Sequence, residues 1–227
     1  MKAFIISILT LLLTISLVAQ NNCSKYYAFN EGTTFQITNY DKKGKTVGII
    51  DYSVTSVRTI EGEEIATITS VVKDKKGEMV LESSYDITCK DDGISIDFKS
   101  LVNPQMLTQY GEFDVDITGT NLDLPNNLSV GQELPDASME MTVSMGIILN
   151  ITVYITNRKV LATENITTPA GTFDCFVLTS TSELKMGIKQ KGTSKEWIAE
   201  GVGIVKQESY NKKGKLIGYS LLTAYNE

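Results

Sequence analysis

The fold is decided by two stretches near the C-terminal end, TPAGTFDCFVL at Thr168–Leu178 and EWIAEGVGIVKQE at Glu196–Glu208. Each joins a glycine turn to a run in which apolar and polar residues alternate. Alternation with a period of two places every second side chain on the same face of a strand. Both stretches therefore predict strands that enter and leave a β-sheet, and neither contains a recognisable catalytic group.

A repeated turn sequence indicates that the rest of the chain also folds as hairpins. NYDKKGKTVG at Asn39–Gly48 and SYNKKGKLIG at Ser209–Gly218 are close repeats, and a shorter variant, KDKKGE, runs from Lys73 to Glu78. In each, Asp or Asn can bond nearby backbone groups and Gly can adopt a left-handed conformation. The lysines have two interpretations, an anion-binding rim or solvated turn tips that discourage edge pairing, and the second needs fewer assumptions.

The runs between the turns are short, alternate, and are rich in β-branched residues, which predicts an all-β, mainly antiparallel protein of roughly a dozen strands. The predicted strands are Thr33–Tyr40, Val47–Ile60, Glu64–Val72, Met79–Thr88, Gly93–Phe98, Asp114–Asn121, Met139–Met145, Ile147–Leu161, Thr172–Ser182, Leu184–Gln190, Thr193–Ala199, Val202–Glu208 and Leu216–Ala224. Asn103 as a cap and Pro104 in a first turn predict one short helix between these strands. The stretch Pro125–Ala137 is predicted to be a loop between two halves.

The first twenty residues predict a secretory signal peptide. Lys2 precedes an apolar stretch from Ala3 to Ala19 and the polar run QNNCSK, which is the pattern of a leader cleaved near Ala19/Gln20. The stretch is at the lower edge of what can span a bilayer, so an uncleaved anchor is the alternative. Lipidation of Cys23 is disfavoured, because that reaction needs a small residue directly before the cysteine. We therefore expect an extracytoplasmic protein, periplasmic or secreted, without a stable transmembrane anchor.

About two hundred residues suffice for one large or two small β domains, and Pro125–Ala137 could be a boundary between two. We predict a single domain over residues 21–227. The formal net charge is −6, and the lysines are interspersed with acidic residues along the chain. Nucleic-acid binding is therefore not expected.

The sequence has three cysteines, Cys23, Cys89 and Cys175. In an oxidising compartment this odd number leaves at least one cysteine without an intramolecular disulfide partner. Cys175 lies in the apolar run FDCFVL, which favours a buried, unpaired thiol. A bridge between Cys23 and Cys89 is then the most plausible pairing, although spacing alone does not determine connectivity.

Four segments resemble the TapB-like family of secreted bacterial proteins, relatives of a domain-of-unknown-function group. They are CSKYYAFNEGTTFQ at Cys23–Gln36, TPAGTFDC at Thr168–Cys175, WIAEGVGIVKQE at Trp197–Glu208 and YNKKGKLIGYSLLTAY at Tyr210–Tyr225. The resemblance implies a spiral β-roll or half-barrel sheet wrapped around a short helix. It implies no activity, because the family has no agreed catalytic residues to carry over.

The absence of histidine excludes Ser-His-Asp and Cys-His catalysis and the commonest zinc sites. Two SxxK matches, Ser70 with Lys73 and Ser182 with Lys185, lie in predicted strands, where residues three apart point to opposite faces. Cys175 has no evident base nearby in the sequence. No serine-lysine dyad and no cysteine nucleophile are therefore expected.

Carboxylates are the remaining candidates for chemistry. Asp114 and Asp116 would share one face of a strand, and Asp91 and Asp92 precede a glycine in a turn, as a calcium site or an acid–base pair could require. Surface carboxylates on an acidic secreted protein are the simpler interpretation. The GVG at Gly201–Gly203 leads into a strand rather than a helix and is interpreted as a turn, not a phosphate loop.

Met139, Met141 and Met145 could bind a soft metal, but their alternation favours core packing or a cavity wall. Trp197, the single tryptophan, could mark a ligand rim and is better explained as a structural anchor. We predict no catalytic, cofactor-binding or metal-binding residues.

The resulting expectation is a non-enzymatic protein of the cell envelope that binds a lipid, glycan or peptide in a curved sheet. Its partner would be an apolar small molecule or an envelope protein. The alternatives are a carboxylate-dependent secreted hydrolase, which needs two acids at a cleft, and a structural envelope protein without a small ligand.

Overall fold

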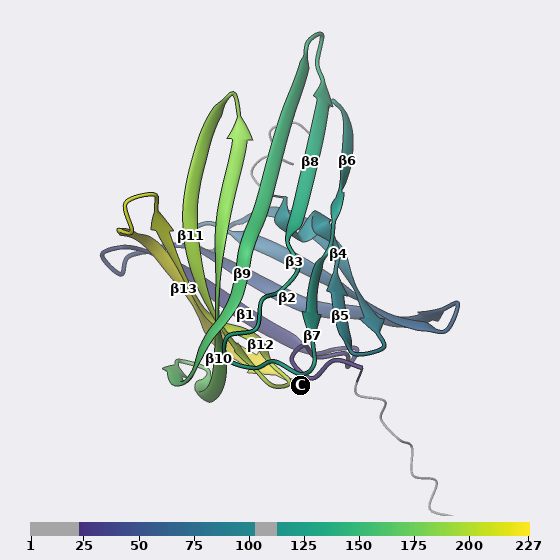
Figure 1. The fold of residues 1–227 in the computed structure, drawn as a ribbon, viewed down its shortest axis with the longest axis vertical. Coiled ribbons are helices and arrows are strands. Elements are labelled where there is room, and N and C mark those ends of the chain that lie inside the picture. Colours follow the sequence, from purple (N-terminus) through teal and green to yellow (C-terminus); the bar gives the residue numbers. More distant parts are fainter. Residues whose placement is uncertain (1–22, 103–112) are drawn as a thin grey trace, which may run out of the picture.

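A computed structural model describes residues 23–102 and 113–227, which form one antiparallel sheet of 13 strands (Figure 1). The strands are β1 (Thr34–Asp41), β2 (Thr46–Ile60), β3 (Glu63–Lys73), β4 (Met79–Lys90), β5 (Gly93–Ile96), β6 (Asp114–Thr120), β7 (Leu122–Pro125), β8 (Ala137–Ser144), β9 (Ile148–Thr168), β10 (Gly171–Met186), β11 (Ile188–Ala199), β12 (Gly203–Asn211) and β13 (Leu216–Asn226). The all-β, antiparallel fold class predicted from the alternation is therefore confirmed.

Helical structure within the described ranges is limited to a short 3-10 helix, η1 (Phe98–Leu101), whose N-terminus is capped by the Asp97 carboxylate. No helix in these ranges is long and apolar enough to cross a membrane. The helix predicted after Asn103 and the predicted signal peptide lie outside the described residues.

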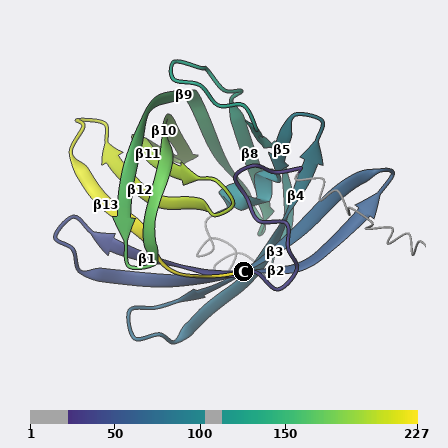
Figure 2. The same ribbon diagram turned by 90° about the horizontal axis from the view of Figure 1, so that it is seen from below.

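Closure of the sheet follows from its strand order, β6-β8-β9-β10-β11-β12-β13-β1-β2-β3-β4-β5-β7. The strands β6 and β7 are at the two ends of this order, yet Asn121 alone separates them in the chain. Because one residue spans only about 3.5 Å, the sheet must curl until its two ends meet. Figure 2 shows the resulting half-barrel, with the strands wrapped around the core.

Asn121 also holds this junction through its side chain. Its Oδ1 accepts a hydrogen bond from the Phe98 amide at 3.1 Å, and its Nδ2 donates one to Ser95 Oγ at 3.1 Å. Ser95 lies on β5 and Phe98 begins η1, so one amide side chain links the β6–β7 junction to the neighbouring strand and helix.

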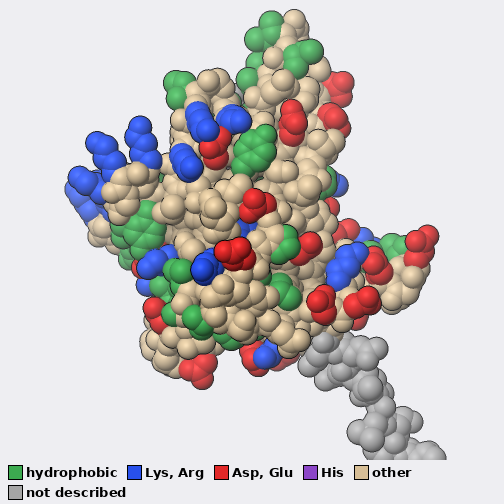
Figure 3. Space-filling model, viewed as in Figure 1, with side chains coloured by type: hydrophobic (Ala, Val, Ile, Leu, Met, Phe, Trp, Pro, Cys, Tyr) green, Lys and Arg blue, Asp and Glu red, His purple; other side chains and the backbone are tan. Residues whose placement is uncertain are grey.

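The repeated lysine turns are hairpins, as predicted, and all three use the same geometry. Asp41, Asp74 and Asn211 each accept two backbone hydrogen bonds through Oδ1, from the residues two and four positions ahead, at 2.8–3.1 Å. These turns join β1 to β2, β3 to β4 and β12 to β13. Figure 3 shows lysine side chains gathered over turns at the upper left of the molecule.

Several of the predicted element boundaries are wrong. The strand predicted to end at Leu161 continues to Thr168 as β9. The segment Leu184–Gln190 is not one strand, because β10 ends at Met186 and β11 begins at Ile188, with a tight turn at Gly187. The sequence there lacks the Asn, Asp and Pro residues that marked the other turns, and Gly187 alone, at φ 68°, reverses the chain. The short strand β7 was also missed, since only its pairing with β5 makes Leu122–Pro125 extended. Between β7 and β8 the chain contains no named strand, and it joins two parts of the same continuous sheet.

The largest buried cluster lies inside the curved sheet, and the N-terminal segment packs against it. Alternation on β10 sends Phe176 and Leu178 toward this cluster and Cys175 and Val177 into a second one. Tyr26, from the segment before β1, is 1% exposed in the inner cluster. The segment therefore covers one end of the half-barrel.

A disulfide between Cys23 and Cys89 attaches this segment to β4, as the sequence suggested. Cys175 is free and buried, which confirms the other part of that expectation. Because Sγ of Cys23 is bonded to Cys89, it is not available for a thioether to a lipid. Lipidation at Cys23 is therefore incompatible with this structure.

We expect Asn121→Ala to lower the free energy of unfolding by about 2 kcal/mol, because two partly buried hydrogen bonds each contribute about 1 kcal/mol. Chemical denaturation would measure this loss. Asn121→Asp, which keeps the acceptor and loses the donor, should fall between wild type and Asn121→Ala. An unchanged midpoint for Asn121→Ala would show that the junction does not depend on this side chain.

Cys23→Ser should cost about 4 kcal/mol of stability, the chain-entropy value for a loop of this length, since the bridged cysteines are 66 residues apart. Thiol alkylation with mass detection tests the pairing itself. The native protein should react at no cysteine, because Cys175 is 4% exposed and burial raises the pKa of its thiol to about 11. Unfolding without reductant should expose one thiol, and a count of three would rule out the bridge.

Candidate binding cavity

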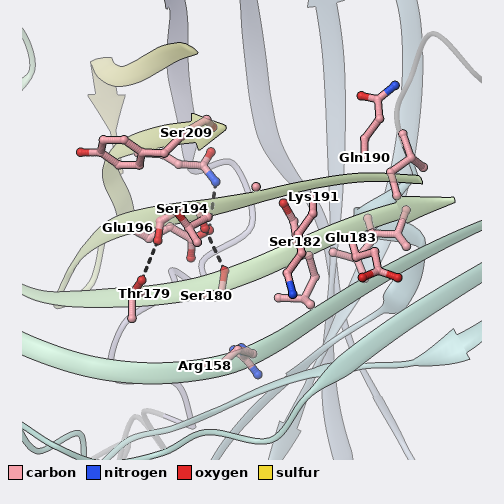
Figure 4. A pocket seen from close by; sticks show the side chains of 18 of the residues that line it. Arg158, Thr179, Ser180, Ser182, Glu183, Gln190, Lys191, Ser194, Glu196 and Ser209 are labelled. Carbon is pink, nitrogen blue, oxygen red and sulfur yellow. Dashed lines mark hydrogen bonds between the residues drawn. The ribbon is translucent and has the colours of Figure 1, made fainter. Parts of the chain in front are cut away.

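A cavity of about 440 Å³ lies on the inner side of the half-barrel, between β9–β12, β7 and η1 (Figure 4). Its position follows from the curled sheet, because strands on opposite sides of the curve face one another there. One wall of the cavity is polar and another is apolar. The difference arises because the inward-facing positions of the strands carry polar residues on one side and apolar residues on the other.

The polar wall is built from neighbouring strands whose inward positions carry hydroxyl, amide and carboxylate groups. Its members are Ser180 and Ser182 on β10, Ser194 and Glu196 on β11, and Gln207 and Ser209 on β12. The register places Ser194 opposite both Ser180 and Ser209. The hydroxyl oxygens of Ser180 and Ser194 are 2.8 Å apart, so they share a hydrogen bond.

The apolar wall comes from the other strands around the cavity and from η1. It consists of Leu101, Leu122, Val153, Ile155, Leu178 and Leu184. Several of these side chains also pack against the buried cluster around Met139 and Met141. The apolar wall therefore rests on a packed core and does not depend on the cavity being filled.

Arg158 lies at the base of the cavity and joins β9 to the opposite side of the sheet. Its side chain is buried, and Nη1 donates to the carbonyl oxygens of Asp123 at 3.1 Å and Pro135 at 2.7 Å. Burial lowers the pKa of the guanidinium, while the nearby Glu196 carboxylate acts in the opposite direction. Arg158 thus ties β9 to β7 and to the loop that follows it.

Glu196 is the acid that faces the cavity from β11. Gln207 Nε2 donates to its Oε1 at 2.9 Å. Burial raises the pKa of this carboxyl and outweighs the opposing effects of Arg158 and Gln207. The ionised form is therefore less favourable in the folded protein than in water, and the group is suited to a hydrogen bond with a polar ligand.

The two SxxK pairs are not brought together. Ser70 is buried and shares a hydrogen bond with Ser83, whereas Lys73 forms an ion pair with Asp51. Ser182 lines the cavity, while Lys185 is exposed and its ammonium lies 4.9 Å from the ring centre of Tyr154. Neither lysine is placed to take a proton from its serine.

The predicted carboxylate pairs lie away from the cavity. Asp114 and Asp116 are exposed on the end strand β6, and Asp91 and Asp92 are exposed in the β4–β5 turn. These are different elements, and none of the four residues lines the cavity. A separate group of possible metal ligands, Cys23, Glu64 and Cys89, has both sulfurs engaged in the disulfide.

The methionines and the tryptophan have the structural roles that the sequence favoured. Met139 and Met141 are fully buried, and Met145 packs against the same cluster. Trp197 is 4% exposed, its Nε1 donates to Glu164 Oε2 at 2.7 Å, and Lys206 lies over its ring. Gly201–Gly203 forms the β11–β12 turn, as predicted.

The sequence analysis missed Glu196, Arg158 and the serines of the polar wall. A signal for Glu196 and Ser194 was present, because both occupy the positions that alternate with buried Trp197 and must face the other side of β11. Nothing local distinguishes Arg158, whose partners lie 23 and 35 residues away.

Glu196→Gln should stabilise the protein at neutral pH. A carboxyl whose pKa is raised on folding binds its proton more tightly in the native state, so its contribution falls as pH rises above the ordinary value of 4.5. Glutamine cannot ionise and can still accept from Gln207. Denaturation at several pH values should show that the stability of Glu196→Gln relative to wild type grows from about pH 4, near the ordinary glutamate pKa, to about pH 7. The control Glu133→Gln, at an exposed position, should not show this growing difference from wild type. If the stability of Glu196→Gln changes with pH as that of wild type does, the prediction is wrong.

Comparisons with known proteins agree with this fold. A crystal structure of a candidate exported protein with a YmcC-like fold from Bacteroides fragilis NCTC 9343 superposes with a TM-score of 0.75 at 22% identity, over 90% of this chain and 100% of that one. A candidate lipoprotein from Parabacteroides distasonis ATCC 8503 gives a TM-score of 0.75 at 25% identity, over 90% and 99% of the two chains.

No curated protein matches the chain. A family model does match, over residues 30–222, and it is described as DUF3108-like. The match covers nearly the whole sheet, from the start of β1 to β13. It agrees with the expected relationship to a domain-of-unknown-function group, whereas membership of the TapB-like family stays a prediction. The chain belongs to the DUF3108-like family.

Proposed function

We propose that this protein is a non-catalytic, extracytoplasmic binding protein that holds an amphiphilic lipid in the inner cavity of its half-barrel. The observation that carries the proposal is the division of the cavity into an apolar wall and a polar wall. A lipid has the same division, with an acyl chain for the apolar wall and a head group for the hydroxyl, amide and carboxylate groups opposite.

The size and construction of the cavity support this choice. Its volume of about 440 Å³ is within the usual range for small-molecule sites, about 300–1,000 Å³. The polar groups converge from β10, β11 and β12, and hydrogen bonds between them hold Glu196, Ser180 and Ser194 in position. A purely apolar ligand would cover these groups and could not satisfy the hydrogen-bonding capacity that they do not use on one another, which is costly.

The extracytoplasmic location rests on three observations of different kinds. The first twenty residues have the pattern of a leader cleaved near Ala19/Gln20. The Cys23–Cys89 disulfide is stable in an oxidising compartment. Two proteins of similar fold are described as an exported protein and a lipoprotein.

A carboxylate-dependent hydrolase is the second candidate, and it is favoured by one observation. Glu183 and Glu196 both line the cavity, and their environments shift their pKa values in opposite directions, as an acid and its partner base require. Lys189, 2.7 Å from Glu183, already forms an ion pair with that carboxylate. We therefore favour binding without catalysis. Turnover of a lipid ester that stops in Glu196→Gln would reverse this preference.

Native mass spectrometry of the protein, purified gently from the compartment in which it accumulates, should detect a bound lipid at defined stoichiometry. The same spectrum tests the leader, because the mature chain should begin at Gln20 or Asn21. Ser182→Phe should abolish the bound species, since its ring would occupy the cavity and the Ser182 side chain makes no hydrogen bond among the described residues that the substitution would break.

The matched control is Thr181→Phe, which adds the same ring one position away on the opposite face of β10. It should retain the lipid. If wild type is a bare chain, or if both variants bind equally, the ligand does not occupy this cavity and a structural envelope role becomes the better explanation.

A further inference from the structure

Five hairpin turns follow one another along a single rim of the half-barrel. They are the turns of β8–β9 (145–147), β10–β11 (187), β12–β13 (212–215), β1–β2 (42–45) and β3–β4 (74–78). Strand pairing places them at the same end, because Gly192 is opposite Asn211, Gly218 is opposite Asp41, and Ile49 is opposite Lys73. We call this end the lysine rim.

Lysines that are scattered in the sequence meet on this rim. Exposed examples are Lys185, Lys189 and Lys191 around the β10–β11 turn, Lys212, Lys213 and Lys215 in the β12–β13 turn, and Lys42, Lys43 and Lys45 in the β1–β2 turn. Among the described residues, no ion pair involves the six lysines of the two KKGK turns. Blue side chains over these turns form the groups at the left and upper centre of Figure 3.

Large apolar side chains are exposed on the same rim. At the β8–β9 tip Ile147 is 70% exposed and Ile148 is 73% exposed, and at the β10–β11 tip Ile188 is 77% exposed. Val47 and Ile217 are also exposed beside the two KKGK turns. Such residues normally occur singly on a protein surface, so their concentration at one end indicates a contact surface.

The opposite rim has the reverse character. Glu61, Asp91, Asp92 and Glu200 are exposed in its turns, between β2 and β3, β4 and β5, and β11 and β12. Although Lys25 pairs with Glu200, acidic groups predominate in these turns, whereas lysines predominate at the lysine rim, so the formal net charge of −6 is unevenly distributed between the two ends. A negatively charged surface would attract the lysine rim and repel the other end.

We propose that the lysine rim docks on an anionic lipid bilayer. The tips of the β8–β9 and β10–β11 hairpins enter the interface through Ile147, Ile148 and Ile188. The lysines of the β12–β13 turn and Lys191 beside the β10–β11 turn contact the head groups, whereas Lys185 and Lys189 pair with Glu183.

This combination of groups favours a membrane over a soluble polyanion or an acidic protein. A soluble polyanion would pair with the lysines but leave the isoleucines at the tips in water. An anionic bilayer offers a negative surface directly above an apolar layer, and narrow hairpin tips can reach both. The rim also adjoins the inner cavity, since Lys191 and Ile217 line it, but the docking does not require the cavity to bind a lipid.

The test is cosedimentation of the mature protein with vesicles of phosphatidylethanolamine and phosphatidylglycerol, compared with vesicles of phosphatidylcholine alone. Wild type should bind the anionic vesicles more tightly, and added salt should weaken the binding. Neutralising Lys212, Lys213 and Lys215 to Gln should weaken it roughly a hundredfold, at about 1 kcal/mol for each lysine near the surface.

The apolar contribution is tested by Ile147→Ser with Ile148→Ser. The control is Ile60→Ser with Val130→Ser, which removes two exposed apolar side chains away from the rim, Ile60 at 49% and Val130 at 60% exposure. All four positions are exposed, so both variants should melt like wild type. The rim variant should lose vesicle binding and the control should keep it.

Three results would overturn the proposal: no preference for anionic vesicles, equal binding by the two apolar variants, or tight binding to soluble heparin that needs the lysines but is unchanged by the Ile147 and Ile148 substitutions. The last result would assign the rim to a soluble polyanion or an acidic protein. Vesicle binding that survives in Ser182→Phe would support the docking even if the cavity were empty, so the two proposals fail separately.

Discussion

The covalent link at Asn121 is the constraint on which the arrangement depends, because it joins two strands at opposite ends of the sheet. Without this link a 13-stranded antiparallel sheet could twist open, with its two end strands far apart. With one residue between β6 and β7, the sheet has to curl, and its inner face becomes enclosed. The side chain of Asn121 then holds the junction to β5 and η1.

Enclosure gives the inner face two different regions. Toward one end, the N-terminal segment with Tyr26 and the disulfide to β4 complete a packed apolar core. Toward the other end, the serines, Gln207 and Glu196 replace apolar residues at inward positions, and a cavity lies there instead of core. Arg158 lies between the two regions, buried and bonded to the backbone of β7 and its following loop.

Closure also determines which turns are neighbours. In an antiparallel sheet alternate turns lie at the same end. Here the lysine-rich turns and the tips with Ile147, Ile148 and Ile188 fall at one end, and the turns with Glu61, Asp91, Asp92 and Glu200 fall at the other. The explanation of the lysines as solvated tips that discourage edge pairing accounts for each turn by itself. It does not account for the exposed Ile147, Ile148 and Ile188 beside them.

The sequence by itself determined the class of structure, because alternation and turn chemistry are local properties. The Asx geometry of the KKG turns, the buried Met139–Met141 pair and the anchor role of Trp197 were all predictable from neighbouring residues. Only the tertiary structure decided the closure at Asn121, the partners of Arg158 and the register that places Ser180, Ser194 and Ser209 side by side. These features depend on contacts between strands far apart in the chain, and no local pattern contains that information.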